Sequence, residues 1–95
     1  EKPLTIDIRK KSEVRSQHIT DAVNIPLNEI NNHLAEFPKD KPFILHCAGG
    51  YRSMIAASML KQRGWDNFSD VIGGFTEIAK TNVPKSEYIC PSTML

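Results

Sequence analysis

The chain has 95 residues, which is enough for one hydrophobic core and too few for two. Hydrophobic residues make up 40% of it and charged residues 24%, as in an average globular domain. Lys and Arg number 12 against 11 Asp and Glu, so the net charge of +1 predicts neither a nucleic-acid-binding surface nor a basic membrane anchor. No apolar run is long enough to span a bilayer, and we expect a cytoplasmic location.

The chain contains two cysteines, Cys47 and Cys90, which are too few for a disulfide framework. No CxxC pair is present to bind zinc, and the three histidines do not have the spacing of metal ligands. We therefore predict neither a metal nor another cofactor. A lone cysteine in a small domain is usually a small buried hydrophobe, so the surrounding residues decide its role.

The first half of the chain predicts two strands and two helical segments. Apolar and polar residues alternate over 4–9, which favours a strand. Ser12 is expected to cap a short helical turn, and 22–26 to form a second strand that ends at a proline. A helix is expected over 28–34, because apolar residues there recur at helical spacing.

The second half continues the alternation with strands expected at 43–46 and 68–72 and helices expected at 53–63 and 75–81. The run at 43–46 is continuously apolar, which is typical of a central strand covered on both faces. Gly64 is expected to end the first of these helices in a left-handed conformation, and Asn82 to cap the second. Strands that alternate with helices over short connections favour an α/β fold with a mainly parallel sheet.

Cys47 lies where an apolar strand is expected to meet a helix, the kind of junction at which open α/β sheets bind ligands. Gly49 and Gly50 allow a tight turn that directs several backbone N–H groups to one point. The positive end of the following helix and the Arg52 guanidinium favour an anion at the same point. We therefore expect a Cys47 pKa below the ordinary value of about 8.5, and a nucleophilic thiolate.

The segment from Cys47 to Ser53 reads CAGGYRS and resembles the CxxGxR[ST] active-site loop of rhodanese-domain sulfurtransferases. Three further segments resemble the same family in the same order: DIR at 7–9, QHI to NIP over 17–26, and GGF at 73–75 with VP at 83–84. Asp21 stands where the family usually has glycine. The resemblance extends over most of the chain, and its four ordered motifs make it specific.

The resemblance implies a rhodanese-like domain over residues 1–95, with 85–95 as a tail. The implied fold is small and three-layered, with a mainly parallel central sheet flanked by helices. The implied activity takes a sulfane sulfur from thiosulfate or a low-molecular-weight persulfide, holds it as a Cys47 persulfide, and passes it to a thiol or cyanide. Cys47 is the expected nucleophile, and the residues expected to bind substrate are Ala48, Gly49, Gly50, Tyr51, Arg52 and Ser53.

Two other functions are compatible with a reactive cysteine in this loop. Cysteine phosphatases and arsenate reductases are disfavoured, because the phosphatase loop is one residue longer than the four residues between Cys47 and Arg52. A sulfur-carrier or regulatory module of a larger enzyme is the alternative that stays open. The family normally has a strand and a helix ahead of the DIR strand, so we expect a fragment of a longer protein.

The resemblance extends to rhodanese domains fused to other enzymes, among them persulfide dioxygenases and hydrolases with a metallo-β-lactamase fold and flavin-dependent coenzyme A disulfide reductases. A covalently attached upstream domain would then be a partner, besides the small-molecule sulfur donor and the thiol acceptor. Neither a nucleic acid nor a membrane is expected as a partner.

Several polar residues have a structural interpretation beside the functional one. Asp7 and Arg9 are expected to form an ion pair, with Arg9–Glu13 as the alternative pairing. His46 should face away from the thiol, because adjacent side chains of a strand point to opposite faces. Arg52 is expected to bind the donor or stabilise the thiolate rather than to be only solvated.

Cys90 lies beyond the last family motif. We expect a passive tail residue there. The alternative is a resolving thiol that attacks the Cys47 persulfide.

Overall fold

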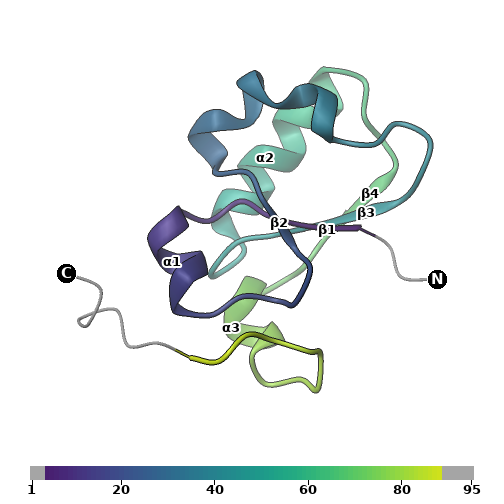
Figure 1. The fold of residues 1–95 in the computed structure, drawn as a ribbon. Coiled ribbons are helices and arrows are strands. Elements are labelled where there is room, and N and C mark those ends of the chain that lie inside the picture. Colours follow the sequence, from purple (N-terminus) through teal and green to yellow (C-terminus); the bar gives the residue numbers. More distant parts are fainter. Residues whose placement is uncertain (1–3, 89–95) are drawn as a thin grey trace.

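A parallel sheet of four strands forms the centre of the molecule (Figure 1). The computed structural model describes residues 4–88 of the chain. The strands are β1 (Leu4–Asp7), β2 (Val23–Asn24), β3 (Phe43–His46) and β4 (Phe68–Asp70), in the order β2-β1-β3-β4. The predicted strands and their parallel arrangement are thus confirmed, although three of the four are shorter than expected.

Alternation along the strands gives the sheet two different faces. Ile6 and Leu45 are paired in register, and both are fully buried on the face covered by α2 (Tyr51–Gln62) and the 3₁₀ helix η1 (Leu27–Asn32). The helices α1 (Lys11–Ser16) and α3 (Gly74–Ile78) lie on the other side of the sheet (Figure 1). The three-layer α/β fold is therefore the predicted one.

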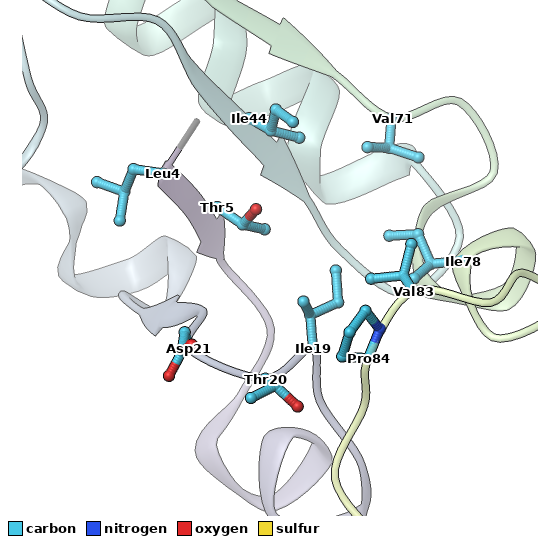
Figure 2. Close-up of a pocket in the computed structure, with 10 residues that line it drawn as sticks. All are labelled: Leu4, Thr5, Ile19, Thr20, Asp21, Ile44, Val71, Ile78, Val83 and Pro84. Atoms are coloured by element: carbon cyan, nitrogen blue, oxygen red, sulfur yellow. The ribbon is translucent and has the colours of Figure 1, made fainter. Parts of the chain in front are cut away.

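The second face of the sheet is only partly covered. Ile44 on β3 and Ile78 on α3 face a groove of about 650 Å³, shown in Figure 2. Its other lining residues are Leu4, Thr5, Ile19, Thr20, Asp21, Val71, Val83 and Pro84. None of the lining residues belongs to 47–53, so this groove is separate from the cysteine loop.

Two predicted helical details of the first half are wrong. Helix α1 begins at Lys11, so Ser12 lies inside its first turn and does not cap it. The Glu13 carboxylate accepts a hydrogen bond from the Lys10 N–H (3.0 Å) and stabilises this earlier start. The expected helix at 28–34 is instead two 3₁₀ segments, η1 and η2 (Leu34–Glu36), in a stretch with three asparagines, a residue of low helix propensity.

The helix ends of the second half agree with the prediction in one case only. Gly64 has a φ of +98°, and the N–H groups of Gly64 and Trp65 return to carbonyls of α2, as in a Schellman motif. Helix α3, however, ends at Ile78, and Asn82 does not cap it. The Thr81 hydroxyl donates to the Ile78 carbonyl (2.6 Å), which is the acceptor that the next helical turn would need.

The structure contains no helix within residues 4–88 that has both the length and the apolar character needed to cross a membrane.

Asp21 has a φ of +70°, so it adopts the left-handed conformation at a position where glycine was the expected residue.

Candidate active site

Cys47 directly follows β3, at the carboxyl edge of the sheet, and the N-terminus of α2 begins four residues later at Tyr51. Its side chain is buried, with only 1% of the residue exposed. Gly50 caps α2 with a φ of +96°, and a Cβ there would lie 3.1 Å from the Gly73 nitrogen. Glycine therefore allows both the turn of this loop and its close contact with the chain ahead of α3.

The Cys47 sulfur accepts hydrogen bonds from the start of α2. The Gly50 N–H lies 3.1 Å and the Ser53 N–H 3.3 Å from Sγ, and the Ser53 hydroxyl lies 3.6 Å away. Burial raises the pKa of the Cys47 thiol, but the Ser53 hydroxyl and the N–H groups of Ser53, Gly50 and Arg52 outweigh it. The net pKa is lowered, so the geometry favours a thiolate.

The first turn of α3 fixes the carbonyl side of the same loop. The Phe75 N–H donates to the Cys47 carbonyl (2.6 Å), and the Thr76 N–H donates to the Ala48 carbonyl (3.0 Å). Gly74 allows this approach, since a Cβ there would lie 2.4 Å from the Cys47 oxygen. With its carbonyls held by α3, the loop presents its N–H groups to the sulfur. The GGF motif was noted in the sequence, but its contact with the loop was not predicted.

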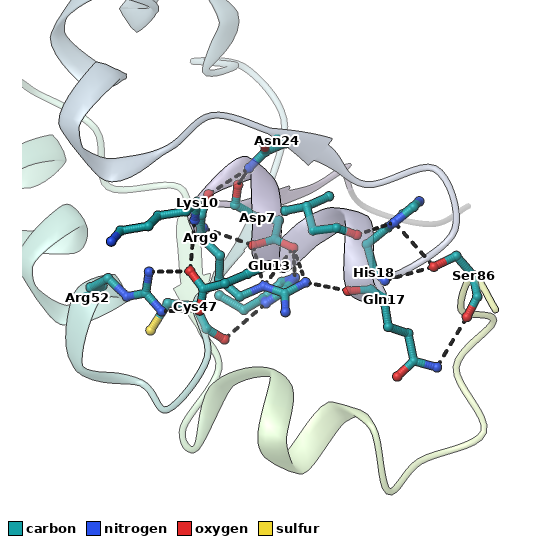
Figure 3. Close-up of polar contacts among 12 residues, drawn as sticks. Asp7, Arg9, Lys10, Glu13, Gln17, His18, Asn24, Cys47, Arg52 and Ser86 are labelled. Carbon is teal, nitrogen blue, oxygen red and sulfur yellow. Dashed lines mark hydrogen bonds and ion pairs between the residues drawn. The ribbon is translucent and has the colours of Figure 1, made fainter. Parts of the chain in front are cut away.

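Arg52 forms a bidentate ion pair with Glu13 of α1, with Nη1–Oε1 at 2.7 Å and Nη2–Oε2 at 2.8 Å (Figure 3). The Arg52 hydrogen bonds lower the pKa of Glu13 from 4.5 to about 2, against the effect of partial burial. Glu13 therefore contacts the cysteine loop through Arg52. This contact was not predicted from the sequence, because only Arg9 was considered as a partner of Glu13. The position of Glu13 in the first turn after the DIR motif was the one available signal.

The predicted Asp7–Arg9 ion pair is confirmed, and it is buried. Arg9 Nη2 lies 2.7 Å from Asp7 Oδ2, and the guanidinium also donates to the Gln17 carbonyl (2.8 Å). Its Cζ lies 4.3 Å from the centre of the Phe75 ring. A structural ion pair that ties the end of β1 to the next loop was expected; the observed pair also connects it to Gln17, which follows α1, and to Phe75 of α3.

His46 lies on the face of the sheet that α3 covers, whereas the Cys47 sulfur contacts the start of α2, so the ring faces away from the thiol as predicted. Its ring is fully buried and stacks on Phe75, with centroids 5.9 Å apart. The nearest carboxylate is that of Asp7, 3.6 Å from Nε2, and Nδ1 lies 3.3 Å from the Cys47 carbonyl oxygen. Burial lowers the pKa of His46. A buried, largely neutral ring that contacts the backbone of Cys47 supports a structural role.

The remaining loop residues differ in their exposure to solvent. Ala48 is partly buried, Gly49 is exposed, and Tyr51 is 74% exposed. Cys90 lies outside the described residues, so its two proposed roles stay predictions. Over residues 4–88, no group of three or more His, Cys, Asp or Glu side chains is placed to hold a metal ion.

Comparison with known proteins assigns this arrangement to a family. The family model described as "Rhodanese-like domain" matches residues 1–81. The chain belongs to the rhodanese-like domain family. Within that family it is similar to "Thiosulfate sulfurtransferase GlpE" of Pseudomonas syringae pv. syringae, with 32% identity over 82 residues that cover 86% of this chain and 76% of the relative.

Solved structures give the same assignment. A rhodanese-related protein from Thermoplasma volcanium matches with a TM-score of 0.79 and 30% identity, covering 87% of this chain and 82% of its own. The reduced CoADR-RHD protein of Bacillus anthracis matches with a TM-score of 0.71 and 37% identity. That match covers 77% of this chain but 13% of the Bacillus protein, so rhodanese-like domains also occur as parts of longer chains. The similarity to named sulfurtransferases supports sulfur transfer as the general activity.

Proposed function

We propose that this rhodanese-like domain transfers a sulfane sulfur through a persulfide on Cys47. The observation that carries the proposal is the pair of N–H groups, from Gly50 and Ser53, 3.1 Å and 3.3 Å from a buried Sγ. Converging donors of this kind stabilise a negative charge on sulfur before and after transfer. The loop thus supports both a nucleophilic thiolate and a bound persulfide anion.

In the first step, the Cys47 thiolate attacks the outer sulfur of the donor. With thiosulfate, the S–S bond of the donor breaks, sulfite leaves with the electron pair, and Cys47 becomes a persulfide anion. With a low-molecular-weight persulfide R–S–SH, the S–S bond of the donor breaks and the sulfur R–S leaves with the electron pair and takes up the proton, which gives the same Cys47 persulfide anion and the thiol R–SH. The name of the Pseudomonas relative supports thiosulfate as a donor.

In the second step, an acceptor removes the outer sulfur from Cys47. Cyanide attacks it and leaves as thiocyanate, or a thiol attacks it and leaves as a persulfide. Either acceptor regenerates the thiolate, so the two half-reactions predict ping-pong kinetics. Within this scheme the backbone of 48–53 binds the transferred sulfur, while Arg52, paired with Glu13, supports the loop rather than supplying a free cation.

The experiment is to incubate the protein with thiosulfate and to measure the mass of the peptide that contains Cys47. We expect one added sulfur atom, and thiocyanate on addition of cyanide. Cys47→Ser should form no adduct and no thiocyanate while it keeps the fold, because serine fills nearly the same buried volume. Cys90→Ser is the matched control and should retain transfer. Full transfer by Cys47→Ser would refute the proposal.

A sulfur-carrier or regulatory module of a larger enzyme is the second candidate. It is supported by the similarity to CoADR-RHD, of which this domain matches 13%. The length of the complete gene product and turnover of the isolated domain distinguish the two. A module that passes sulfur only to an attached domain would form the Cys47 persulfide yet turn over slowly with free acceptors.

A further inference from the structure

His46 is a buried histidine that no step of the proposed sulfur transfer uses, and both of its ring nitrogens face oxygen acceptors. It lies on β3 directly before Cys47, and 0% of the residue is exposed. Its Nδ1 lies 3.3 Å from the Cys47 carbonyl oxygen, and its Nε2 lies 3.6 Å from Oδ2 of Asp7, its neighbour in register on β1. Burial lowers the pKa of His46, so at neutral pH the ring has a single proton for these two acceptors.

Asp7 does not need the proton of His46, because Arg9 already donates to both of its carboxylate oxygens. The Arg9 Nη2 lies 2.7 Å from Oδ2, while Nε and the backbone N–H each lie 3.0 Å from Oδ1. Dashed lines in Figure 3 mark this pairing. The His46 Nε2 is beyond hydrogen-bond distance of Asp7 and has no other partner within residues 4–88. The contacts therefore favour the tautomer with its proton on Nδ1.

The Cys47 carbonyl is the acceptor that faces this proton, and a carbonyl oxygen can accept two hydrogen bonds. The Phe75 N–H occupies one of its positions at 2.6 Å. The ring of the same Phe75 stacks on the imidazole of His46, with centroids 5.9 Å apart, and the Arg9 Cζ lies 4.3 Å from the centre of the Phe75 ring. These ring contacts keep Nδ1 beside the oxygen that Phe75 also holds.

The direction of this carbonyl determines the direction of the next N–H group. None of the described peptide bonds is cis, so the Ala48 N–H points opposite to the Cys47 carbonyl across a planar peptide. Within residues 4–88 no group accepts a hydrogen bond from the Ala48 N–H. With its oxygen held beside α3, this peptide presents the positive end of its dipole on the side away from α3.

We propose that His46 is a positioning residue for Cys47: its Nδ1–H holds the Cys47 carbonyl beside α3 and keeps the N–H end of that peptide available to the sulfur. Without this donor, the partly negative carbonyl oxygen is less firmly held away from the sulfur, which disfavours the thiolate. The inference rests on the proposed sulfur transfer only for its effect on turnover. The tautomer and the reactivity of the thiol can be measured without it.

The first test is the position of the proton in the wild-type protein. The ¹⁵N NMR shifts of the imidazole ring distinguish a protonated from a bare nitrogen, and His46→Asn identifies the signals of this ring among the three histidines. At neutral pH we expect a proton on Nδ1 and none on Nε2. A proton on Nε2 alone, or on both nitrogens, would overturn the inference.

Three variants then separate the donor from the ring. His46→Asn can keep the donor without the ring, because its amide nitrogen is bonded to Cγ, as Nδ1 is in histidine. His46→Phe keeps a ring to stack on Phe75 but has no donor, and His46→Gln is the matched control, with its amide one atom further from the backbone. On the acid side of the Cys47 titration, His46→Phe and His46→Gln should react with iodoacetamide about fivefold more slowly than wild type. His46→Asn should stay within about twofold, and thiocyanate formation should follow the same order.

Urea unfolding distinguishes positioning from packing. A phenyl ring fills the site of the imidazole better than a small amide, so His46→Phe should be more stable than His46→Asn although its thiol is less reactive. A reactivity order that follows the stability order would overturn the inference, as an effect of packing alone. A wild-type protein that is alkylated at Cys47 as expected but forms no thiocyanate would instead overturn the proposed function and leave the positioning role intact.

Discussion

The Ser53 hydroxyl offers a direct test of how the loop stabilises the Cys47 thiolate. Ser53 is fully buried, and its Oγ lies 3.2 Å from the Gly50 carbonyl and 3.6 Å from Sγ. A hydroxyl has a single proton. While Cys47 is a thiol, that proton can go to the Gly50 carbonyl; once Cys47 ionises, it can turn toward the sulfur. Ser53→Ala removes this adjustable donor and leaves the N–H groups of Gly50 and Ser53 in place.

The expected magnitude is the difference between two hydrogen bonds. A hydrogen bond to a charged acceptor contributes about 1.5–3 kcal/mol, and the neutral bond to the Gly50 carbonyl that it replaces contributes about 0.5–1.5 kcal/mol. The thiolate therefore gains about 1 kcal/mol from Ser53, which corresponds to about a fivefold change in the ionisation constant. Ser53→Ala should raise the pKa of Cys47, because the Ser53 hydroxyl is the largest of the contacts that lower it against the effect of burial.

The assay is the rate of alkylation of Cys47 by iodoacetamide as a function of pH, with the modified peptide identified by mass. On the acid side of the titration, Ser53→Ala should react about fivefold more slowly than wild type, and at high pH the two rates should converge. Ser58→Ala is the matched control, since Ser58 is an exposed serine of the same helix and should leave the profile unchanged. Identical profiles for Ser53→Ala and wild type would refute the proposed role of the hydroxyl.

Two further predictions concern the supports of the loop. Gly74→Ala should lower the free energy of unfolding by about 2 kcal/mol or more and reduce thiocyanate formation, because its Cβ would lie 2.4 Å from the Cys47 oxygen. Gly49→Ala is the matched control, since a Cβ at this position meets nothing within 4 Å. Its free energy of unfolding, measured by urea denaturation, should not fall by that amount. Glu13→Gln should lower the free energy of unfolding by about 1 kcal/mol at neutral pH. This value is reduced for solvent screening, because the Arg52 and Glu13 side chains are 29% and 32% exposed. The pKa of Glu13 is about 2 in the folded protein and 4.5 in the absence of its partners. Between these pH values Glu13 is protonated in the unfolded state but ionised in the folded state, so lowering the pH favours unfolding. The difference between wild type and Glu13→Gln in urea unfolding should therefore shrink as the pH falls from 4.5 to about 2, and a constant difference would contradict the ion pair.

The parts of the fold that could be predicted from sequence are those set by local pattern. The β1 and β3 strands were predictable because alternation or continuous apolar character follows from burial of the sheet. The left-handed Gly64 was predictable because few residues other than glycine adopt that conformation. The helix expected at 28–34 was wrong because its apolar spacing suits a 3₁₀ segment about as well over so short a stretch.

In the candidate site, too, local features could be predicted from the sequence and contacts between distant residues could not. The position of Cys47 between a strand and a helix is local, and the sequence predicted it together with the N–H groups of the loop. The Arg52–Glu13 pair joins residues 39 apart in the sequence, and the Thr76–Ala48 hydrogen bond joins residues 28 apart. Contacts of this kind depend on how α1 and α3 are placed over the sheet end, which no spacing in the sequence specifies.

The charge balance around Cys47 bears on how a sulfur donor is selected. Arg9 is neutralised by buried Asp7, and Arg52 by Glu13, so the sulfur is stabilised mainly by N–H groups and the Ser53 hydroxyl rather than by a free cation. Fixed dipoles stabilise one negative charge on sulfur in the same way whatever group delivered it. Discrimination between donors or acceptors must then arise outside the loop.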